Sequence, residues 1–96
     1  MHLIKTTSND LELLKKIANK IIKKELSKCI HIAKITSIYK WDGKIINDDE
    51  FSLEIKSKNI KKVYKIIKKH HNYECFEFVY YKFRAKDKYL EFLKEK

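Results

Sequence analysis

The strongest structural signal in this chain is the segment Cys29-Ile-His-Ile-Ala-Lys-Ile-Thr-Ser-Ile-Tyr-Lys-Trp41, followed by Asp42-Gly43. Its Ile, Thr and Tyr content is typical of a strand. Asp-Gly predicts a tight primed turn, because glycine readily adopts the positive φ that such a turn requires. Beyond the turn, Phe51, Leu53 and Ile55 alternate with polar residues, which indicates a half-buried second strand. The turn lies well before this alternation, so we expect a long hairpin whose tip projects from the domain and packs on another subunit.

A helix is predicted on each side of this hairpin. The first runs from about Asp10 to Leu26, with Asn9 and Glu12 as a capping box. Its apolar residues recur at helical spacing and are Leu11, Leu14, Ala18, Ile21 and Ile22. The second helix begins after Ser57 or Asn59, either of which is a suitable cap. Its apolar residues follow the same spacing and are Ile60, Val63, Tyr64 and Ile67.

Three shorter segments complete the pattern. His2 to Thr7 is typical of a first strand, Tyr73 to Phe83 of a fourth strand, and Asp87 to Lys94 of a short C-terminal helix with Leu90 and Leu93 facing inward. The order β-α-β-β-α-β predicts an α+β, ferredoxin-like fold, in which two helices cover one face of a four-stranded antiparallel sheet. We expect a single domain over residues 1–96.

Composition and charge narrow the possible functions. The chain has 96 residues, of which 44% are hydrophobic, and its net charge is +10. Only Arg84 is arginine, and the abundant lysine and isoleucine are typical of A/T-rich codons, so the charge is a weak argument for nucleic-acid binding. No apolar run approaches about 18 residues, so we expect no membrane span. Residues 1–7 carry no leader pattern and two cysteines favour a reduced compartment, so we expect a cytoplasmic protein.

The residues around the turn resemble the signature of the CutA family. The run Ser37-Ile-Tyr39-Lys-Trp41-Asp-Gly43-Lys44-Ile45 matches its hairpin, and Leu26 to Ile32 is similar to the segment that leads into it. His71-Asn72-Tyr73-Glu74-Cys75-Phe76-Glu77 is similar to the family's His-Pro-Tyr-Glu-x-Pro-Glu. Both prolines are therefore replaced here, by Asn72 and Phe76, and we expect a looser backbone at this point. Lys28 also stands where the family commonly has alanine, so packing there is expected to differ.

The resemblance implies a homotrimer in which projecting hairpins pair between subunits. It also implies a role in tolerance to divalent cations, copper above all, and an architecture similar to the trimeric PII-type signalling proteins. A polar cleft is expected between subunits, lined by Tyr39, Trp41, Glu50, Lys56, His71, Tyr73, Glu74 and Glu77. The sequence leaves two interpretations open: an ion-pair network that fixes the subunit contact, or a pocket for a small ligand or ion. Trp41 is expected to anchor the contact.

The resemblance further implies a metal site, since some family members bind copper through two adjacent histidines and a thiol near the first strand. His70 and His71 match the histidines, whereas Thr6 stands at the thiol position. Imidazole is a good Cu(II) ligand, so we predict weak binding of Cu(II) or another divalent cation at these histidines. The alternative is that His70 ends a helix and His71 is a structural residue. Cys29 and Cys75 are further soft ligands, although buried structural cysteines are the commoner case.

An enzyme is not expected, because the single glycine excludes a phosphate-binding loop and no serine lies in a nucleophile elbow. Glu74 and Glu77, three residues apart in a predicted strand, are expected to face opposite ways. The alternative function is an RNA-binding domain of the RRM type, which has the same element order. That module stacks bases on aromatic residues of its first and third strands. Here the first strand has no aromatic residue and Phe51 of the third is expected to face the core, so we do not expect nucleic acid as a partner.

Overall fold

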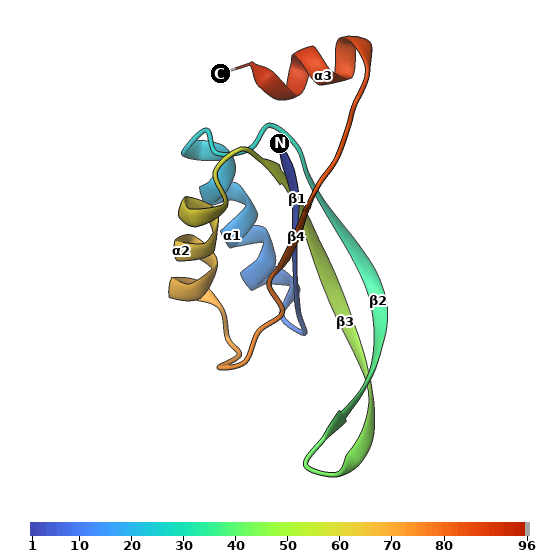
Figure 1. Cartoon of the computed structure of the whole chain (residues 1–96). Helices are drawn as coiled ribbons and strands as arrows, with labels where there is room; N and C mark the ends of the chain where they lie inside the picture. Colours follow the sequence, from blue (N-terminus) through green and yellow to red (C-terminus); the bar gives the residue numbers. More distant parts are fainter. Residues whose placement is uncertain (96) are drawn as a thin grey trace.

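Two helices cover one face of a four-stranded antiparallel sheet in the computed structural model, which describes residues 1–95 (Figure 1). The predicted α+β, ferredoxin-like fold is therefore confirmed. The elements are β1 (His2–Ser8), α1 (Leu11–Lys23), β2 (Ile30–Trp41), β3 (Lys44–Ser57), α2 (Ile60–His70), β4 (Val79–Lys82) and α3 (Asp87–Lys94). The strand order is β2-β3-β1-β4. Within residues 1–95, every helix is too short or too polar to span a lipid bilayer.

The hydrophobic core lies between the sheet and the two long helices. Ile4 of β1 and Leu53 and Ile55 of β3 are fully buried against it. The helices contribute Leu14, Ile17, Ile21, Val63, Ile66 and Ile67. Ile17 and Ile66 were not among the predicted core positions, whereas the predicted Ile22 and Tyr64 are 40% and 37% exposed. On each helix, the predicted apolar stripe is centred slightly away from the face that packs on the sheet. Periodicity alone does not locate the centre of a wide apolar stripe.

The ends of α1 differ from the prediction. Asp10, not Asn9, caps the helix, since its carboxylate accepts from the backbone N–H of Leu13 at 3.0 Å. The helix ends at Lys23 rather than Leu26, because Glu25 adopts a left-handed φ of 59°. The N–H groups of Glu25 and Leu26 then donate to the carbonyl groups of residues 22 and 21, which is a Schellman motif. The second helix, α2, is capped by Asn59, which is one of the two predicted candidates.

The β2–β3 hairpin is long and projects beyond the body of the domain (Figure 1). The two strands pair from Ile30 with Ile55 to Trp41 with Lys44. Strand β1 pairs with β3 only as far as Ser8 with Phe51, so the remainder of the hairpin is two-stranded. Its turn residues Asp42 and Gly43 have φ values of 53° and 74°, as the primed turn requires.

The C-terminal quarter contains one wrong prediction and one confirmed one. Strand β4 is only Val79–Lys82, since residues 73–78 form a loop rather than the predicted strand. Helix α3 has the predicted bounds, and its Leu93 is buried.

Lys28 packs on this helix: its Nζ lies 5.0 Å from the ring centre of Phe92 and 3.7 Å from Glu95 Oε2. The lysine that replaces alanine therefore helps to hold α3 against the start of β2.

Candidate ligand pocket

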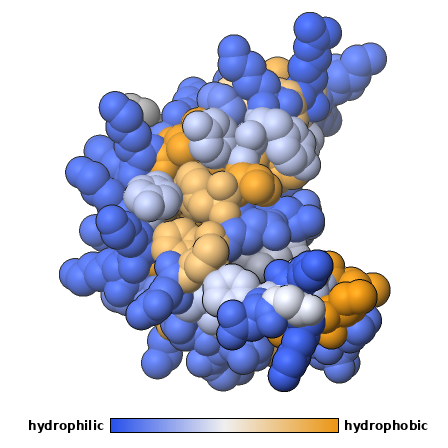
Figure 2. All heavy atoms as spheres, turned by 60° about the horizontal axis from the view of Figure 1, so that its bottom comes forward, coloured by the Kyte–Doolittle hydropathy of each residue, from blue (hydrophilic) through white to orange (hydrophobic). Residues whose placement is uncertain are grey.

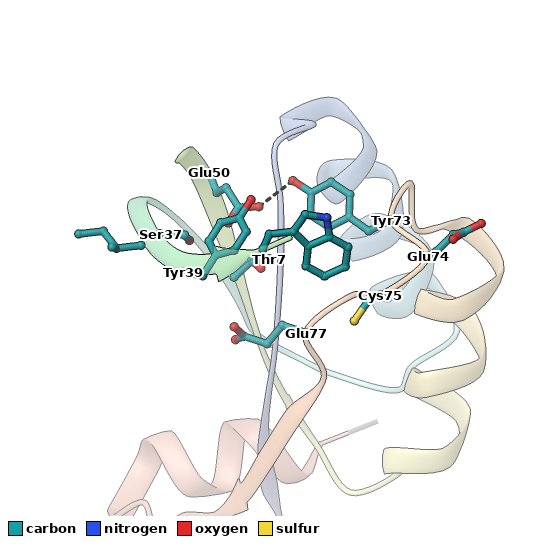
Figure 3. A pocket seen from close by; sticks show the side chains of 10 residues that line it. Thr7, Ser37, Tyr39, Glu50, Tyr73, Glu74, Cys75 and Glu77 are labelled. Atoms are coloured by element: carbon teal, nitrogen blue, oxygen red, sulfur yellow. Dashed lines mark hydrogen bonds between the residues drawn. The ribbon is translucent and has the colours of Figure 1, made fainter. Parts of the chain in front are cut away.

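A cavity of about 680 Å³ lies between the hairpin and the loop that precedes β4 (Figure 3). It is lined by Thr7, Ser37, Ile38, Tyr39, Trp41, Glu50, Tyr73, Glu74, Cys75 and Glu77. Six of the eight residues predicted for the cleft line it, although their place at a subunit contact stays a prediction. Strand β1, the hairpin and the 73–77 loop each supply part of the wall, so the cavity exists only in the folded chain.

Glu50 and Tyr73 form a hydrogen-bonded pair across this cavity (Figure 3). The Tyr73 hydroxyl donates to Glu50 Oε2 at 2.6 Å and accepts from the backbone N–H of Asn9 at 2.9 Å. Glu50 is only 6% exposed, so this bond offsets part of the cost of burying its charge. Burial, together with the bond to Glu50, raises the pKa of Tyr73 to about 12. Tyr73 therefore stays protonated at neutral pH and donates continuously to the carboxylate.

A second phenol–carboxylate pair lies on the hairpin itself. The Tyr39 hydroxyl donates to Asp48 Oδ2, and this bond raises the pKa of Tyr39 above its ordinary value. Tyr39 and Trp41 project from the same face of β2, since successive side chains on a strand alternate between faces. The pocket therefore presents aromatic surface next to acidic oxygen atoms. Such a wall suits a ligand with a cationic or hydrogen-donating group.

His71 lies behind the pocket and holds its loop in place. Its Nε2 is 2.8 Å from the carbonyl oxygen of Thr7, and its Nδ1 accepts from the backbone N–H of Tyr73 at 3.0 Å. This pair of contacts assigns the proton to Nε2 and leaves no ring nitrogen without a partner. Burial lowers the pKa of His71, in spite of the raising effects of the Thr7 carbonyl and Glu50. His71 is therefore neutral at pH 7 and acts here as a structural residue.

The predicted metal ligands His70 and His71 have separate surroundings. His70 Nε2 lies 3.2 Å from Lys20 Nζ on α1, and its pKa is lowered by burial and by the charges of Lys20 and Lys69. His71 would have to give up one of its two hydrogen bonds to bind a cation. Within residues 1–95 no group of three or more His, Cys, Asp and Glu side chains is arranged to hold a metal ion. These residues are a poor fit to the implied copper site, which stays a prediction.

Lys56 and the two cysteines differ from their expected surroundings. Lys56 does not line the cavity but lies at the base of the hairpin, 3.3 Å from His31 Nδ1. Cys75 is exposed and lines the cavity, and Cys29 is half-buried, so neither is a fully buried structural cysteine. Glu74 and Glu77 lie in a loop, and both contribute to the cavity wall, although the carboxylate of Glu74 points away from Glu50 (Figure 3).

Four residues of the wall were missed: Thr7, Ser37, Ile38 and Cys75. The pairing register of the strands would have identified Thr7 and Ser37 as wall residues. Thr7 pairs with Ser52 and Ser37 with Asp48, so both lie on the same sheet face as Glu50. Cys75 had no such signal, because its position depends on the irregular loop.

Asn72 and Phe76, which stand where the family has prolines, make specific contacts in the loop. Asn72 accepts from Ser8 Oγ at 2.7 Å and donates to Asn9 Oδ1 at 2.9 Å. Phe76 stacks on the His71 ring, with centroids 4.9 Å apart and planes 15° apart. Side-chain contacts therefore restrain the loop where proline would restrain its backbone.

The two central strands carry no aromatic residue on the open face of the sheet within the described chain. Register places Thr7, Glu50 and Ser52 on that face, while Phe51 packs against the core as predicted. An RRM-type domain would need stacking residues at such central positions. This arrangement does not favour the RNA-binding alternative.

Comparison with known proteins agrees with this fold and with the hairpin motif. Residues 2–96 match the family model described as CutA1 divalent ion tolerance protein. The chain is 34% identical over 84 residues to the chloroplastic protein CutA of Arabidopsis thaliana, which covers 83% of this chain and 46% of that protein. It is 34% identical over 55 residues to the divalent-cation tolerance protein CutA of Archaeoglobus fulgidus, which covers 57% of this chain and 54% of that protein.

The crystal structure of CutA1 from Oryza sativa superposes with a TM-score of 0.88 at 31% identity, covering 97% of this chain and 89% of that one. This chain spans about half the length of the curated relatives it matches. The family description names tolerance to ions and no chemical reaction. On the strength of the family match, the shared fold and the hairpin motif, this chain belongs to the CutA1 divalent ion tolerance protein family.

Proposed function

We propose that this chain acts in the response to divalent metal cations as a non-catalytic homotrimer whose pocket senses a small ligand or cation. The observation that carries the proposal is the position of the pocket. Part of its wall comes from the same hairpin whose tip exposes apolar side chains. A subunit bound at the tip would contact the pocket wall, so ligand binding and subunit contact would be coupled.

The surface of the hairpin supports self-association. Ile38, Trp41 and Ile45 are 69%, 57% and 76% exposed, although each is a large apolar side chain. Seen from the end that carries the hairpin tip, hydrophobic surface interrupts a largely hydrophilic face (Figure 2). Strand β2 is also an edge strand, and its outer backbone groups are available to pair with another chain. A copy of the same chain is the partner that the family resemblance implies.

The chemistry of the pocket supports ligand sensing. Glu50 is buried and already oriented by Tyr73, so a cation or a donor group that enters would meet a fixed carboxylate. Tyr39, Trp41 and Glu77 lie around the same space. A wall of this kind binds a small ligand with little rearrangement, as a regulatory trimer of the PII type would require.

Copper binding at His70 and His71 is the weaker part of the proposal. Cu(II) would have to displace a hydrogen bond from His71 and would approach His70 beside the ammonium group of Lys20. Both requirements reduce affinity, which agrees with binding that is weak rather than tight. If the site is used, changing both histidines to alanine removes the copper adducts. An unchanged number of adducts would place the metal elsewhere.

Native mass spectrometry at physiological ionic strength, with a slight excess of Cu(II), tests the proposal directly. Three chains of 11.7 kDa give a mass of about 35 kDa, and adducts counted per chain measure metal binding. Trp41→Ala is expected to lower the trimer fraction at low micromolar protein. Ile22→Ser, at an exposed apolar position on α1, is the control and is expected to leave it unchanged.

A monomer for the native chain would contradict the proposal and would return RNA binding to consideration. A salt-sensitive shift of labelled RNA would then be the measurement to make.

A further inference from the structure

A second cluster of reactive side chains lies at the base of the hairpin, apart from the pocket. Cys29 directly precedes β2 and His31 lies within it, two residues apart, so both side chains point to the same side. Cys29 Sγ is 3.7 Å from His31 Nε2. Lys56 of β3 reaches the same place, with Nζ 3.3 Å from His31 Nδ1 and 4.0 Å from Cys29 Sγ. Tyr89 of α3 lies near this cluster, and the neighbouring Cys29 together with burial raises the pKa of its hydroxyl above the ordinary value.

The distance between sulfur and nitrogen matches two ligands of one metal ion. Bonds of about 2.3 Å to sulfur and about 2.0 Å to imidazole nitrogen, at an angle between tetrahedral and trigonal, separate the ligand atoms by about 3.5–3.7 Å. Cys29 and His31 already have this separation, so binding would not require the strand to move. His31 is exposed and Cys29 half-buried, so an ion can reach both from solvent.

We propose that Cys29 and His31 form a binding site for a soft cation, Cu(I), with Lys56 occupying the site when the metal is absent. A thiolate and an imidazole are ligands that favour Cu(I), which is stable with fewer ligands than the four that structural zinc requires. The site offers two such ligands. A single chain builds it, so the inference does not rest on the proposed trimer or on the pocket.

Lys56 gives the proposal its most specific consequence. In the metal-free chain its ammonium group donates to His31 Nδ1, which leaves the ring proton on Nε2, facing the sulfur. A bound cation would replace that proton, move the ring proton to Nδ1 and repel the ammonium group. Lys56 therefore competes with the metal, and removing its charge is expected to tighten binding. An incidental contact between three side chains would predict no such gain.

The test is competition for Cu(I) between the full chain and a chromophoric Cu(I) chelator under anaerobic conditions, with the ultraviolet thiolate-to-copper band as a second readout. Cys29→Ser is expected to weaken binding by about 100-fold and abolish the band, and His31→Ala to weaken binding by about tenfold. Lys56→Met is expected to strengthen binding by about threefold or more, since about 0.7 kcal/mol of charge repulsion is removed. Circular dichroism of each variant checks that the fold is intact.

Cys75→Ser is the matched control, because it removes the other thiol and is expected to leave both affinity and band unchanged. Retained affinity in Cys29→Ser would overturn the proposal, as would weaker binding in Lys56→Met. Loss of Cu(I) only when His70 and His71 are changed would also overturn it, by placing the metal at the other candidate site. The oligomeric state does not enter these outcomes, so failure here is distinct from failure of the proposed function.

Discussion

The base and the tip of the β2–β3 hairpin are built from the same kind of residue but have different surroundings. At the base, Leu53 and Ile55 are fully buried under the helices. At the tip, Ile38 and Ile45 are 69% and 76% exposed. The alternation of side chains is the same in both parts, so burial depends on what the rest of the chain places against each face. The base is stabilised by its own chain, whereas the tip is a contact surface only under the proposed self-association.

Leu53→Ala tests this difference with the largest expected effect. The substitution leaves a cavity in the core and is expected to lower the free energy of unfolding by about 3 kcal/mol. Urea titration at two chain concentrations is the measurement. The loss should be the same at both concentrations, because it arises within one chain.

Ile45→Ser at the tip is the matched comparison. It is expected to change the free energy of unfolding by less than about 0.5 kcal/mol in the dissociated chain, since the side chain is mostly exposed there. Under the proposed self-association, its effect should grow at higher concentration. Equal losses for the two variants at every concentration would contradict the distinction between base and tip.

Gly43→Val tests the turn at the tip. Gly43 has a φ of 74°, so a β-branched residue is expected to cost about 1–2 kcal/mol of hairpin stability. Among residues 1–95, no atom lies within 4 Å of the position a Cβ would take, so the cost comes from the backbone conformation rather than from a clash with other residues. Hydrogen exchange should accelerate for amides of the two-stranded part and change little at the base. Uniform acceleration along both strands would show that tip and base open together.

Glu25→Gly acts near the base, at the end of α1. Its left-handed φ of 59° is strained for a side-chain residue, so glycine is expected to raise the free energy of unfolding by about 0.5–1 kcal/mol. Lys24→Gly is the control, because Lys24 has a φ of −81° and glycine there has no strain to relieve. Urea midpoints compare the two. Destabilisation by both variants would contradict the assignment of strain to Glu25.

The smallest effect is expected from the pH dependence of His71. Its pKa is lowered on folding from an ordinary value of 6.5, chiefly by burial, so the unfolded chain binds more protons below that pH. The contribution of neutral His71 is therefore present above pH 6.5 and is lost as pH falls from 6.5 towards the folded pKa. Urea midpoints at about pH 7.5 and about pH 5.5 should differ less in His71→Gln than in the native chain. An unchanged difference would assign the titration to another group.

Much of the fold was predictable because local patterns agreed with one another. The Asp42-Gly43 turn, the alternation around Leu53 and the second helix all lie where the sequence predicts them. The predicted strand over residues 73–83 was wrong for its first part, where Phe76 stacks on His71 instead of extending. Alternating aromatic residues are typical of a strand. The segment forms a loop here because Phe76 packs on His71, a contact that the local pattern does not reveal.

The sequence predicted many of the residues in the candidate site but not how they are arranged in space. The hairpin motif pointed to Tyr39, Trp41 and Glu50, all of which line the pocket. The family resemblance places Lys56 in the same cleft, yet Lys56 lies six positions from Glu50 along β3. It lies beside Cys29 and His31 instead, a cluster that follows from the pairing of β2 with β3.

By itself, the sequence determined the order of the elements, the turn and the family, because each depends on residues that are close along the chain. Only the tertiary structure decided which groups share a site. The pairing of Glu50 with Tyr73, the two hydrogen bonds of His71 and the approach of Lys56 to Cys29 join residues more than twenty positions apart, or depend on such contacts. Hydrogen bonds act over about 3 Å, so their partners are set by strand register and loop path. Local propensity does not specify either of these.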